Sequence, residues 1–304
     1  MNVDICICTF QRPCVIRTLK SIADMNVPKD VILQVIVVDN DVSPTAKPMI
    51  KAFQDTADFP VIYAHKPAGN ISIARNGALE ISKARFLAFI DDDETVSRDW
   101  LMHLLDTQAQ TGAGVVLGPV QATYMPHAPK WMKQGVFHDT KPVWVNGQIQ
   151  TGYTCNVLLD RDQMAFNDLT FDLEKGQTGG EDTSFFHQLF ERDVLFAFAP
   201  QAVVSEAVPD IRATLKWLAE RRKRMGQTQA EVYYQDLGLA GKCKVLALSA
   251  AKIAFCMVGA ALTIPLAHKR NAWFLRGMLH VGVISALFGA RAITPYGLAD
   301  KTAG

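Results

Sequence analysis

The sequence has no charge imbalance, no paired cysteine spacing and no secretion signal. Its 31 Lys and Arg residues are matched by 30 Asp and Glu residues, so a net charge of +1 gives no electrostatic basis for nucleic-acid binding. Six scattered cysteines match neither a zinc site nor a disulfide scaffold. The segment Met1 to Phe10 carries Asp4 and no basic region or cleavage site, which predicts that the N-terminal part stays in the cytoplasm.

Apolar runs alternate with amphipathic stretches through the first two hundred residues. The predicted strands are 3–9, 31–38, 61–64, 86–90 and 115–120. The predicted helices are 44–54, 71–83 and 97–110. The second strand is apolar almost throughout, as in a parallel strand that is buried on both faces. The pattern predicts an α/β fold with a mostly parallel sheet flanked by helices.

Candidate binding residues stand directly after four of the predicted strands. They are Thr9, Asp39, the segment 69–76 with Arg75, and the run Asp91-Asp92-Asp93. In open parallel sheets, ligands bind beyond the carboxyl ends of the strands, so these residues share one address. Taken singly, Thr9 is also typical of a helix cap, Asp39 of a turn and Arg75 of a solvated helix face.

The aspartate run Asp91-Asp92-Asp93 follows a strongly apolar strand. Three adjacent carboxylates repel one another unless a cation or solvent relieves them. Mg²⁺ and Mn²⁺ favour oxygen ligands, and Mg²⁺ typically takes one or two carboxylates together with substrate phosphates. The run therefore predicts a divalent metal site, and a solvated acidic turn is the alternative.

A second acidic signal is Glu181-Asp182, which follows two glycines and begins a predicted helix that runs to about Arg192. One interpretation is that these acids only complement the helix dipole. The other is a general base, because displacement at an anomeric carbon needs a group that accepts the proton of the acceptor hydroxyl. A carboxylate and a metal together would supply both needs of that reaction.

Five motifs in order resemble the family 2 glycosyltransferases. They are Thr9-Phe10 with Arg12-Pro13, Val37-Val38-Asp39-Asn40, Asn70 to Asn76, Phe89-Ile90-Asp91-Asp92-Asp93 and Gly180-Glu181-Asp182. The resemblance covers about residues 1–225, and the chain is more narrowly similar to bacterial exopolysaccharide glucosyltransferases of the succinoglycan type. It implies a GT-A fold, a nucleotide-diphosphate sugar as donor, Mn²⁺ or Mg²⁺ as cofactor, and inversion at the anomeric carbon.

The resemblance also implies roles for single residues. Thr9, Asp39 and Arg75 would contact the nucleotide, with Asp39 near the base. Asp91 would bind the ribose, and Asp93 together with Asp91 would hold the metal. Asp182 would be the general base, and Glu181 would support the acceptor or the local geometry. Many relatives place a histidine near the metal, but this chain has none at 203–206, which leaves any further metal ligand open.

The C-terminal region, 226–304, is expected to be a membrane-associated helical appendage to a glycosyltransferase domain at 1–225. Residues 245–267 are almost all apolar and long enough for about one bilayer crossing, and 278–290 form a second, shorter apolar stretch unless it extends toward Leu298. Basic residues on both sides of the first stretch, and Lys252 within it, favour a hairpin in or on the cytoplasmic leaflet. A true span and a packed helical pair are the alternatives.

The basic run Arg221 to Arg224 is typical of a solvated helix end. Contact with the donor diphosphate, or with the phosphates of a lipid or a lipid-linked acceptor, are the functional alternatives.

Together these observations predict a metal-dependent hexosyltransferase at the cytoplasmic face of the cell membrane. It would move glucose from UDP-glucose onto a polyprenyl-diphosphate-linked oligosaccharide, in contact with membrane lipid and with other polysaccharide assembly proteins. A sugar nucleotidyltransferase is one alternative, although Thr9 to Pro13 contains no glycine-rich phosphate loop. A non-catalytic membrane-bound partner of a polysaccharide assembly complex is the other.

Overall fold

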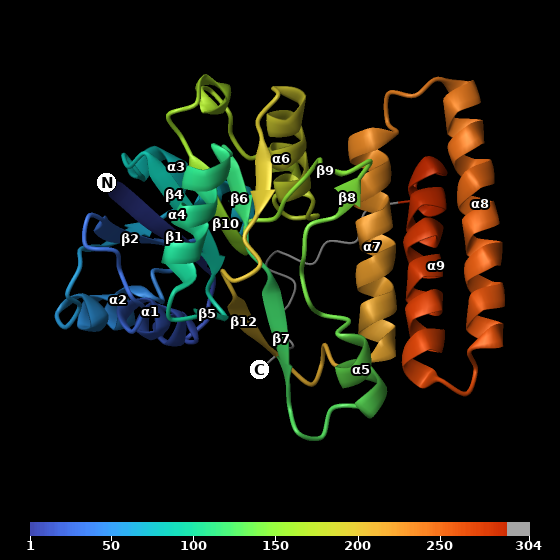
Figure 1. The fold of residues 1–304 in the computed structure, drawn as a ribbon, viewed down its shortest axis with the longest axis horizontal. Helices are drawn as coiled ribbons and strands as arrows, with labels where there is room; N and C mark the ends of the chain where they lie inside the picture. Colours follow the sequence, from blue (N-terminus) through green and yellow to red (C-terminus); the bar gives the residue numbers. More distant parts are fainter. Residues whose placement is uncertain (291–304) are drawn as a thin grey trace. The chain divides into compact units, whose positions relative to one another are not determined.

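The computed structural model describes residues 1–290, and the chain divides into two compact units (Figure 1). The first unit comprises Met1–Gln121 and Asp139–Glu206. The second comprises Ala122–His138 and the described residues from Ala207 onward. The predicted boundary near residue 225 falls inside a helix of the second unit.

A seven-stranded sheet forms the centre of the first unit, with the strand order β11-β6-β10-β4-β1-β2-β3. The neighbours β3, β2, β1 and β4 run parallel, and β10 is antiparallel to both β4 and β6. The sheet is therefore mostly parallel, as the sequence predicts. Its strands are β1 Asn2–Thr9, β2 Ile32–Asp39, β3 Val61–His65, β4 Phe86–Asp91, β6 Val115–Leu117, β10 Asn156–Asp160 and β11 Phe196–Phe198.

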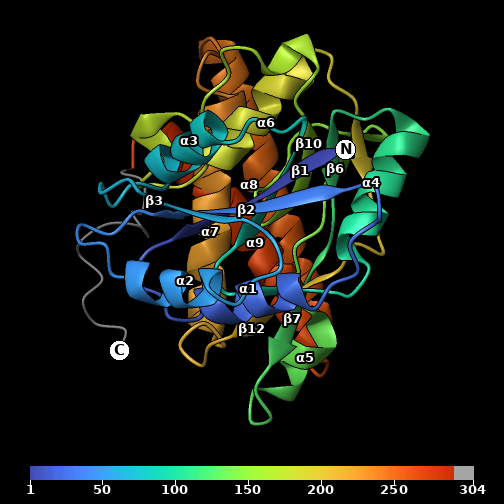
Figure 2. The same ribbon diagram turned by 90° about the vertical axis from the view of Figure 1, so that its left-hand side faces the viewer.

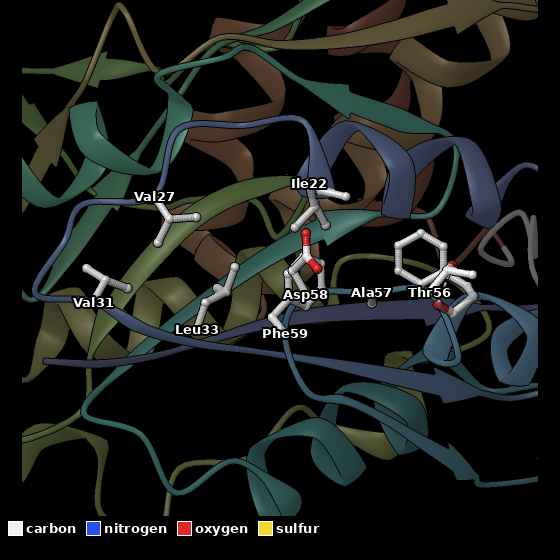
Figure 3. Close-up of a pocket in the computed structure, with 10 residues that line it drawn as sticks. Ile22, Val27, Val31, Leu33, Thr56, Ala57, Asp58 and Phe59 are labelled. Atoms are coloured by element: carbon white, nitrogen blue, oxygen red, sulfur yellow. Dashed lines mark hydrogen bonds between the residues drawn. The ribbon is translucent and has the colours of Figure 1, made fainter.

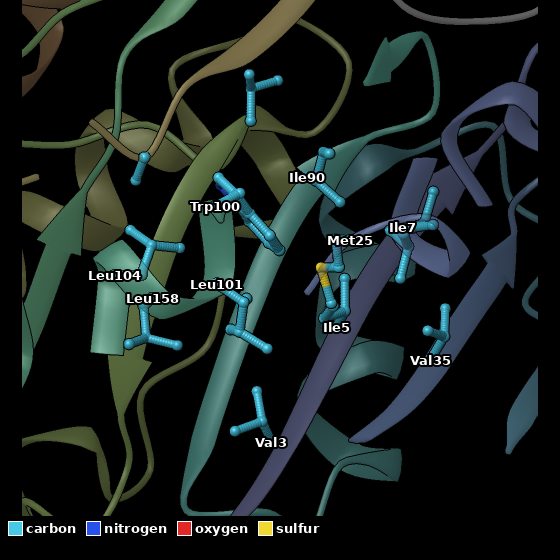
Figure 4. Close-up of a cluster of buried hydrophobic side chains, with 14 of the residues drawn as sticks. Val3, Ile5, Ile7, Met25, Val35, Ile90, Trp100, Leu101, Leu104 and Leu158 are labelled. Atoms are coloured by element: carbon cyan, nitrogen blue, oxygen red, sulfur yellow. The ribbon is translucent and has the colours of Figure 1, made fainter. Parts of the chain in front are cut away.

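Helices cover both faces of this sheet, because successive side chains of its strands point to opposite sides. Ile5 and Ile7 of β1 pack with α1, α2 and α4, as Figure 4 shows for the β1 side chains and α4, whereas Cys6 packs with α3 and α6 on the other face. In Figure 2, α1 and α2 lie below the sheet and α3 and α6 lie above it. The helices are α1 Val15–Ala23, α2 Lys47–Gln54, α3 Ile71–Ile81, α4 Trp100–Thr111 and α6 Glu181–Glu191.

The predicted strand 115–120 is wrong, since the chain forms two strands there instead of one. β6 ends at Leu117, and β7, Val120–Tyr124, joins β5, Glu94–Val96, and β12, Val204–Val208, in a separate three-stranded sheet. The break falls at Gly118-Pro119. Proline has no N–H to give to a strand ladder, and a Cβ at Gly118 would overlap the Asn156 side chain. A short hairpin of β8, Trp144–Val145, and β9, Gln148–Ile149, completes the strands.

The second unit is mostly helical, and its helices are α5 Lys130–Gly135, α7 Leu215–Tyr233, α8 Leu239–Leu262 and α9 Ala267–Leu287. α7 and α9 approach closely through two glycines: a Cβ at Gly226 would overlap the carbonyl oxygen of Leu279, and one at Gly282 would overlap that of Lys223. The interpretation of Arg221 to Arg224 as a helix end is wrong, because α7 continues to Tyr233 and carries this run at its middle.

The C-terminal helices differ in extent from the predicted apolar stretches. α8 begins at Leu239 and ends at Leu262, shortly before Pro265, which cannot continue a helix and disfavours helical backbone in the residue before it. The second stretch is the C-terminal half of α9, and its expected extension toward Leu298 lies outside the described residues. Of the described helices, α8 alone is long and apolar enough to cross a membrane, and 11% of its most apolar window is buried.

Candidate active site

The predicted site residues meet where the strand order reverses. β2 and β3 lie on one side of β1, and the chain then returns to place β4 on its other side. Cys8 is paired in register with Asp91, so the segments that leave β1 and β4 emerge side by side. Such a switch point opens a crevice at the carboxyl ends of the strands. This topology explains why residues about 80 positions apart in the sequence form one cluster.

Arg12 holds the aspartate cluster together. Its guanidinium donates to Asp92 Oδ1 at 3.0 Å and to Asp93 Oδ2 at 2.8 Å. Thr9 Oγ1 donates to the other oxygen of Asp92 at 2.7 Å. Burial raises the pKa of Asp92 to about 6, although Arg12 and Thr9 oppose that rise. Thr9 and Arg12 thus place the acidic run, and the nucleotide contact of Thr9 stays a prediction.

Asp39 is fully buried at the end of β2. Its carboxylate accepts hydrogen bonds from the Tyr63 hydroxyl at 2.8 Å and from the backbone N–H groups of Asp41 at 3.1 Å and Ala46 at 3.0 Å. These bonds fix the turn that leads into α2. The Asp39 carboxylate thus already accepts three hydrogen bonds within the protein. Its contact with the base of the nucleotide stays a prediction.

Arg75 connects the segment after β3 to the second acidic motif. It lies on α3 and forms a buried ion pair with Glu181 Oε1, and its guanidinium carbon lies 5.6 Å from the Phe171 ring centroid. The other carboxylate oxygen of Glu181 is buried and has no hydrogen-bond partner among the described residues. The structure thus links Arg75 to Glu181 rather than leaving Arg75 free at the sheet edge, and Glu181 anchors the start of α6.

Asp182 lies in the first turn of α6, which Gly180 begins with a left-handed φ of 93°. Its Oδ1 accepts from the backbone N–H of Thr183 at 2.6 Å. Burial raises the pKa of Asp182 to about 6, the neighbouring Glu181 carboxylate adds to the rise, and Arg75 opposes it. A carboxylate with such a pKa is ionised at neutral pH and yet basic enough to accept a proton in catalysis.

Charged groups of both acidic motifs act on the Asp91 carboxylate. Burial raises its pKa, Arg75 and Arg12 oppose the rise, and the carboxylates of Asp93 and Asp182 add to it. Its backbone N–H donates to the buried Glu94 carboxylate at 2.9 Å. The charges of both motifs therefore act on one half-buried carboxylate, whose ionised form a nearby cation would stabilise.

Sequence reasoning missed Arg12 and Glu94 as parts of this cluster. Arg12 stands three residues after the end of β1 and belongs to the first motif, but no sequence signal indicated that it would reach Asp92 and Asp93. Glu94 follows the acidic run directly. In place of the absent histidine near 203–206, β12 pairs with β5, with Glu206 opposite Glu94.

The first unit has a pocket of about 300 Å³, whose lining residues Figure 3 shows. Its lining includes Ile22 near the end of α1, Leu33 near the start of β2 and Phe59 before β3. These positions are at the amino ends of the strands, opposite the edge where the acidic residues gather. The pocket therefore contains none of the predicted site residues.

The family follows from comparison with known proteins. A model of the family described as Glycosyl transferase family 2 matches residues 4–165. The chain is 47% identical over 302 residues, covering 99% of it, to "Succinoglycan biosynthesis protein ExoM" of Rhizobium meliloti strain 1021, of which it covers 98%. The chain belongs to the family 2 glycosyltransferases. The resemblance read from its five motifs is thereby confirmed.

Solved glycosyltransferase structures confirm the fold of this family 2 member. The chain resembles the mannosyltransferase PcManGT of Pyrobaculum calidifontis, in complex with GDP-Man and Mn²⁺, at a TM-score of 0.64 and 18% identity over 95% of the chain and 88% of that structure. It resembles S. aureus TarS 1–349, in complex with UDP-GlcNAc, at 0.54 and 15% identity over 97% and 99%. The fold is thus GT-A-like, with a mostly parallel sheet.

The acidic residues fit a hard divalent cation by their chemistry. Asp91 and Asp93 offer carboxylate oxygens from half-buried side chains, which Mg²⁺ and Mn²⁺ prefer. Within residues 1–290, no three His, Cys, Asp or Glu side chains form a ready group of metal ligands. A site in which one or two carboxylates act together with substrate phosphates needs no such group. Arg12 neutralises Asp93 in this structure, so metal binding there would have to compete with an ion pair.

Proposed function

We propose that this family 2 glycosyltransferase transfers glucose from UDP-glucose to a lipid-linked oligosaccharide, with inversion and with a divalent metal, in succinoglycan biosynthesis. The similarity to a protein named for succinoglycan biosynthesis extends over 99% of the chain, which supports the pathway. Structural relatives in complex with GDP-Man and Mn²⁺ or with UDP-GlcNAc support a nucleotide-sugar donor and a metal.

The observation that carries the proposal is the link between the two acidic motifs. Arg75 binds Glu181 directly, and its charge opposes the burial that raises the pKa of both Asp91 and Asp182. One cation thus favours the ionised form of both the proposed ribose ligand and the proposed base. Acids that only complemented the dipole of α6 would not need Arg75 as a buried partner.

Asp182 is the general base that accepts the proton of the acceptor hydroxyl. As the acceptor oxygen forms its bond to the anomeric carbon, its proton passes to Asp182 and the bond to the diphosphate oxygen breaks. A single displacement of this kind inverts the anomeric carbon. Glu181, held by Arg75, fixes the first turn of α6 so that the Asp182 carboxylate is placed before the substrate binds.

Asp91 and Asp93 would hold the metal, with Asp91 also near the ribose, and the bound metal would neutralise the charge that develops on the leaving diphosphate. Thr9 and Arg12 hold Asp92 and Asp93 at the edge of the sheet. The proposed contacts of Thr9, Asp39 and Arg75 with the nucleotide belong to the same site.

The second unit supports a membrane location at the cytoplasmic face. α8 is long and apolar enough to cross a bilayer, and Phe255, Val258 and Leu262 on it are 66%, 58% and 79% exposed. Lys252 is exposed at the middle of α8, where a charge in a spanning helix would cost about 2.5–3.5 kcal/mol. This cost favours a hairpin that lies in the leaflet, where Lys252 reaches the headgroups.

The test is a panel of radiolabelled UDP-sugars and GDP-sugars, incubated with the protein, Mn²⁺ and a lipid extract that supplies the acceptor. Label from UDP-glucose is expected in the lipid phase, in a product that a β-glucosidase cleaves and an α-glucosidase does not. The Asp182→Asn variant is the control, and it should neither transfer glucose nor hydrolyse the donor. Transfer of another sugar, an α-linked product or donor hydrolysis that survives Asp182→Asn would each contradict the proposal.

A further inference from the structure

The turn between α8 and α9 is apolar and exposed. Leu262, Ile264 and Leu266 are 79%, 61% and 46% exposed, and they stand within five residues of one another. Turns at a protein surface are normally built from small and polar residues. An exposed group of large apolar side chains marks a contact with a ligand, a partner or a membrane.

A groove of about 390 Å³ lies beside this turn, within the second unit. Its lining is mostly apolar and comes from α7, α8, α9 and the turn: Leu215, Met257, Ala260, Ile264 and Phe274. Arg270 lines it as well and is its one charged residue. Apolar walls around a single cation suit a hydrocarbon chain that carries an anionic group.

Arg270 is positioned to bind an anion from outside the protein. Its Nε–H donates to Asn271 Oδ1 at 3.1 Å, and Asn271 is buried. Among residues 1–290, no carboxylate lies within ion-pair distance of Arg270, and the sequence contains no Asp or Glu from 237 to 290. A guanidinium without a carboxylate partner is suited to phosphate, which it binds through parallel hydrogen bonds.

We propose that this groove binds the polyprenyl diphosphate of the acceptor, with the isoprenoid chain along α8 and α9 and the phosphate on Arg270. The inference rests on the proposed function, because it assumes a lipid-linked acceptor. An isoprenoid diphosphate presents one chain and one anionic group, which matches a single apolar groove beside one cation, whereas a phospholipid presents two chains. The exposed apolar turn gives a lipid in the membrane direct access to the groove.

The experiment measures binding of radiolabelled geranylgeranyl diphosphate to the full chain in nanodiscs of phosphatidylcholine. Arg270→Gln should weaken binding at least about tenfold, because it removes the positive charge that binds the phosphate. Ala260→Phe should weaken it similarly because it fills the groove. Lys269→Gln and Ala251→Phe are the matched controls, since both residues are exposed and neither lines the groove, and they should stay within about twofold of wild type.

Two competitors identify the ligand. Inorganic diphosphate should compete at least about a hundredfold more weakly than geranylgeranyl diphosphate, because it lacks the chain. Phosphatidylglycerol added to the nanodiscs should displace little of the probe. Equal competition by diphosphate would mean that the groove contributes nothing, and equal competition by phosphatidylglycerol would mean a phospholipid site. Either result, or unchanged binding in both Arg270→Gln and Ala260→Phe, would overturn the inference.

Enzyme kinetics separate this inference from the proposed function. Arg270→Gln should raise the KM for the lipid-linked acceptor while kcat and the hydrolysis of UDP-glucose stay at the wild-type level. If wild type transfers glucose to the lipid acceptor and Arg270→Gln has an unchanged KM, the groove is wrong and the function stands. If wild type binds the probe through Arg270 but never uses a lipid acceptor, the proposed function is wrong.

Discussion

The acidic edge of the sheet and the α8–α9 hairpin differ in how their cations are paired. At the edge, Arg12 is paired with Asp92 and Asp93, and Arg75 is paired with Glu181. The sequence from 237 to 290, which includes the hairpin, has no Asp or Glu but has six Lys and Arg residues. These six are Lys242, Lys244, Lys252, Lys269, Arg270 and Arg276.

The difference follows from what each region meets. A charge that is buried needs a partner within the protein, since removal of that partner leaves a carboxylate that neither water nor a cation stabilises. Exposed cations without carboxylates keep their full attraction for phosphates outside the protein. The charges of the edge therefore set geometry and pKa, whereas those of the hairpin would attract phosphates outside the protein.

The largest effect is expected at Asp182. Asp182→Asn removes the group that accepts the acceptor proton, so kcat should fall by roughly two to four orders of magnitude, while UDP binding changes little. Single-turnover kinetics and equilibrium binding of UDP measure the two quantities. Asp162→Asn is the matched control, because the Asp162 side chain is 68% exposed and forms a surface ion pair with Arg85 at 3.4 Å. A loss of UDP binding equal to the loss of rate would assign Asp182 a structural role.

A smaller effect is expected at the proposed metal ligand. Asp93→Asn should weaken Mn²⁺-dependent binding of UDP by about a hundredfold and leave metal-free binding unchanged, because one charged ligand is lost. Isothermal titration of UDP with and without Mn²⁺ tests this. Asp106→Asn, at an exposed position of α4, is the control. Unchanged Mn²⁺ dependence would remove Asp93 from the metal site.

The sequence predicted the positions of the site residues at the strand ends better than it predicted their ion-pair and hydrogen-bond partners. Thr9, Asp39 and Asp91 each end a strand, because apolar β-branched runs followed by polar residues mark strand ends reliably. The pairing of Arg75 with Glu181 joins residues 106 positions apart and depends on how α3 and α6 pack on one face of the sheet. No local pattern reports that packing.

The order of the strands in the sheet could not be predicted from the sequence either. β10 enters the sheet antiparallel between β4 and β6, and its pairing is a long-range choice with no signal in β10 itself. The basic run Arg221 to Arg224 was misjudged for a similar reason. A run of cations is typical of a helix end in isolation, but Gly226 and Gly282 let α7 pack closely on α9 and continue.

The pH dependence tests whether burial at the edge tunes the base. The pKa of Asp182 is raised to about 6, so its carboxylate holds a proton at pH values where an ordinary aspartate has lost it. A protonated base cannot accept the acceptor proton, and kcat/KM should therefore fall about tenfold between pH 7 and pH 5. UDP binding is followed over the same range, which separates the titration of the base from that of Asp92, whose pKa is also about 6. A rate that is constant down to pH 5 would show that Asp182 is not the titrating base.

The smallest effects come from two arginines that contrast the regions directly. Arg12→Gln leaves Asp92, whose side chain is 5% exposed, without its cation, so the free energy of unfolding at pH 7 should fall by about 1–2 kcal/mol. Arg276 is exposed on α9 and has no carboxylate on the hairpin, so Arg276→Gln should leave stability within about 0.5 kcal/mol.

Binding to anionic vesicles should reverse that order. Each cation near a negative lipid surface contributes about 1 kcal/mol, so Arg276→Gln should weaken binding to phosphatidylglycerol vesicles about fivefold. Arg12→Gln should leave it unchanged, because the carboxylates of Asp92 and Asp93 already neutralise Arg12. Denaturant unfolding and vesicle sedimentation on the same two variants measure both quantities. If Arg276→Gln lowered stability and left vesicle binding intact, the hairpin cations would serve the fold, and the contrast between paired and outward charge would fail.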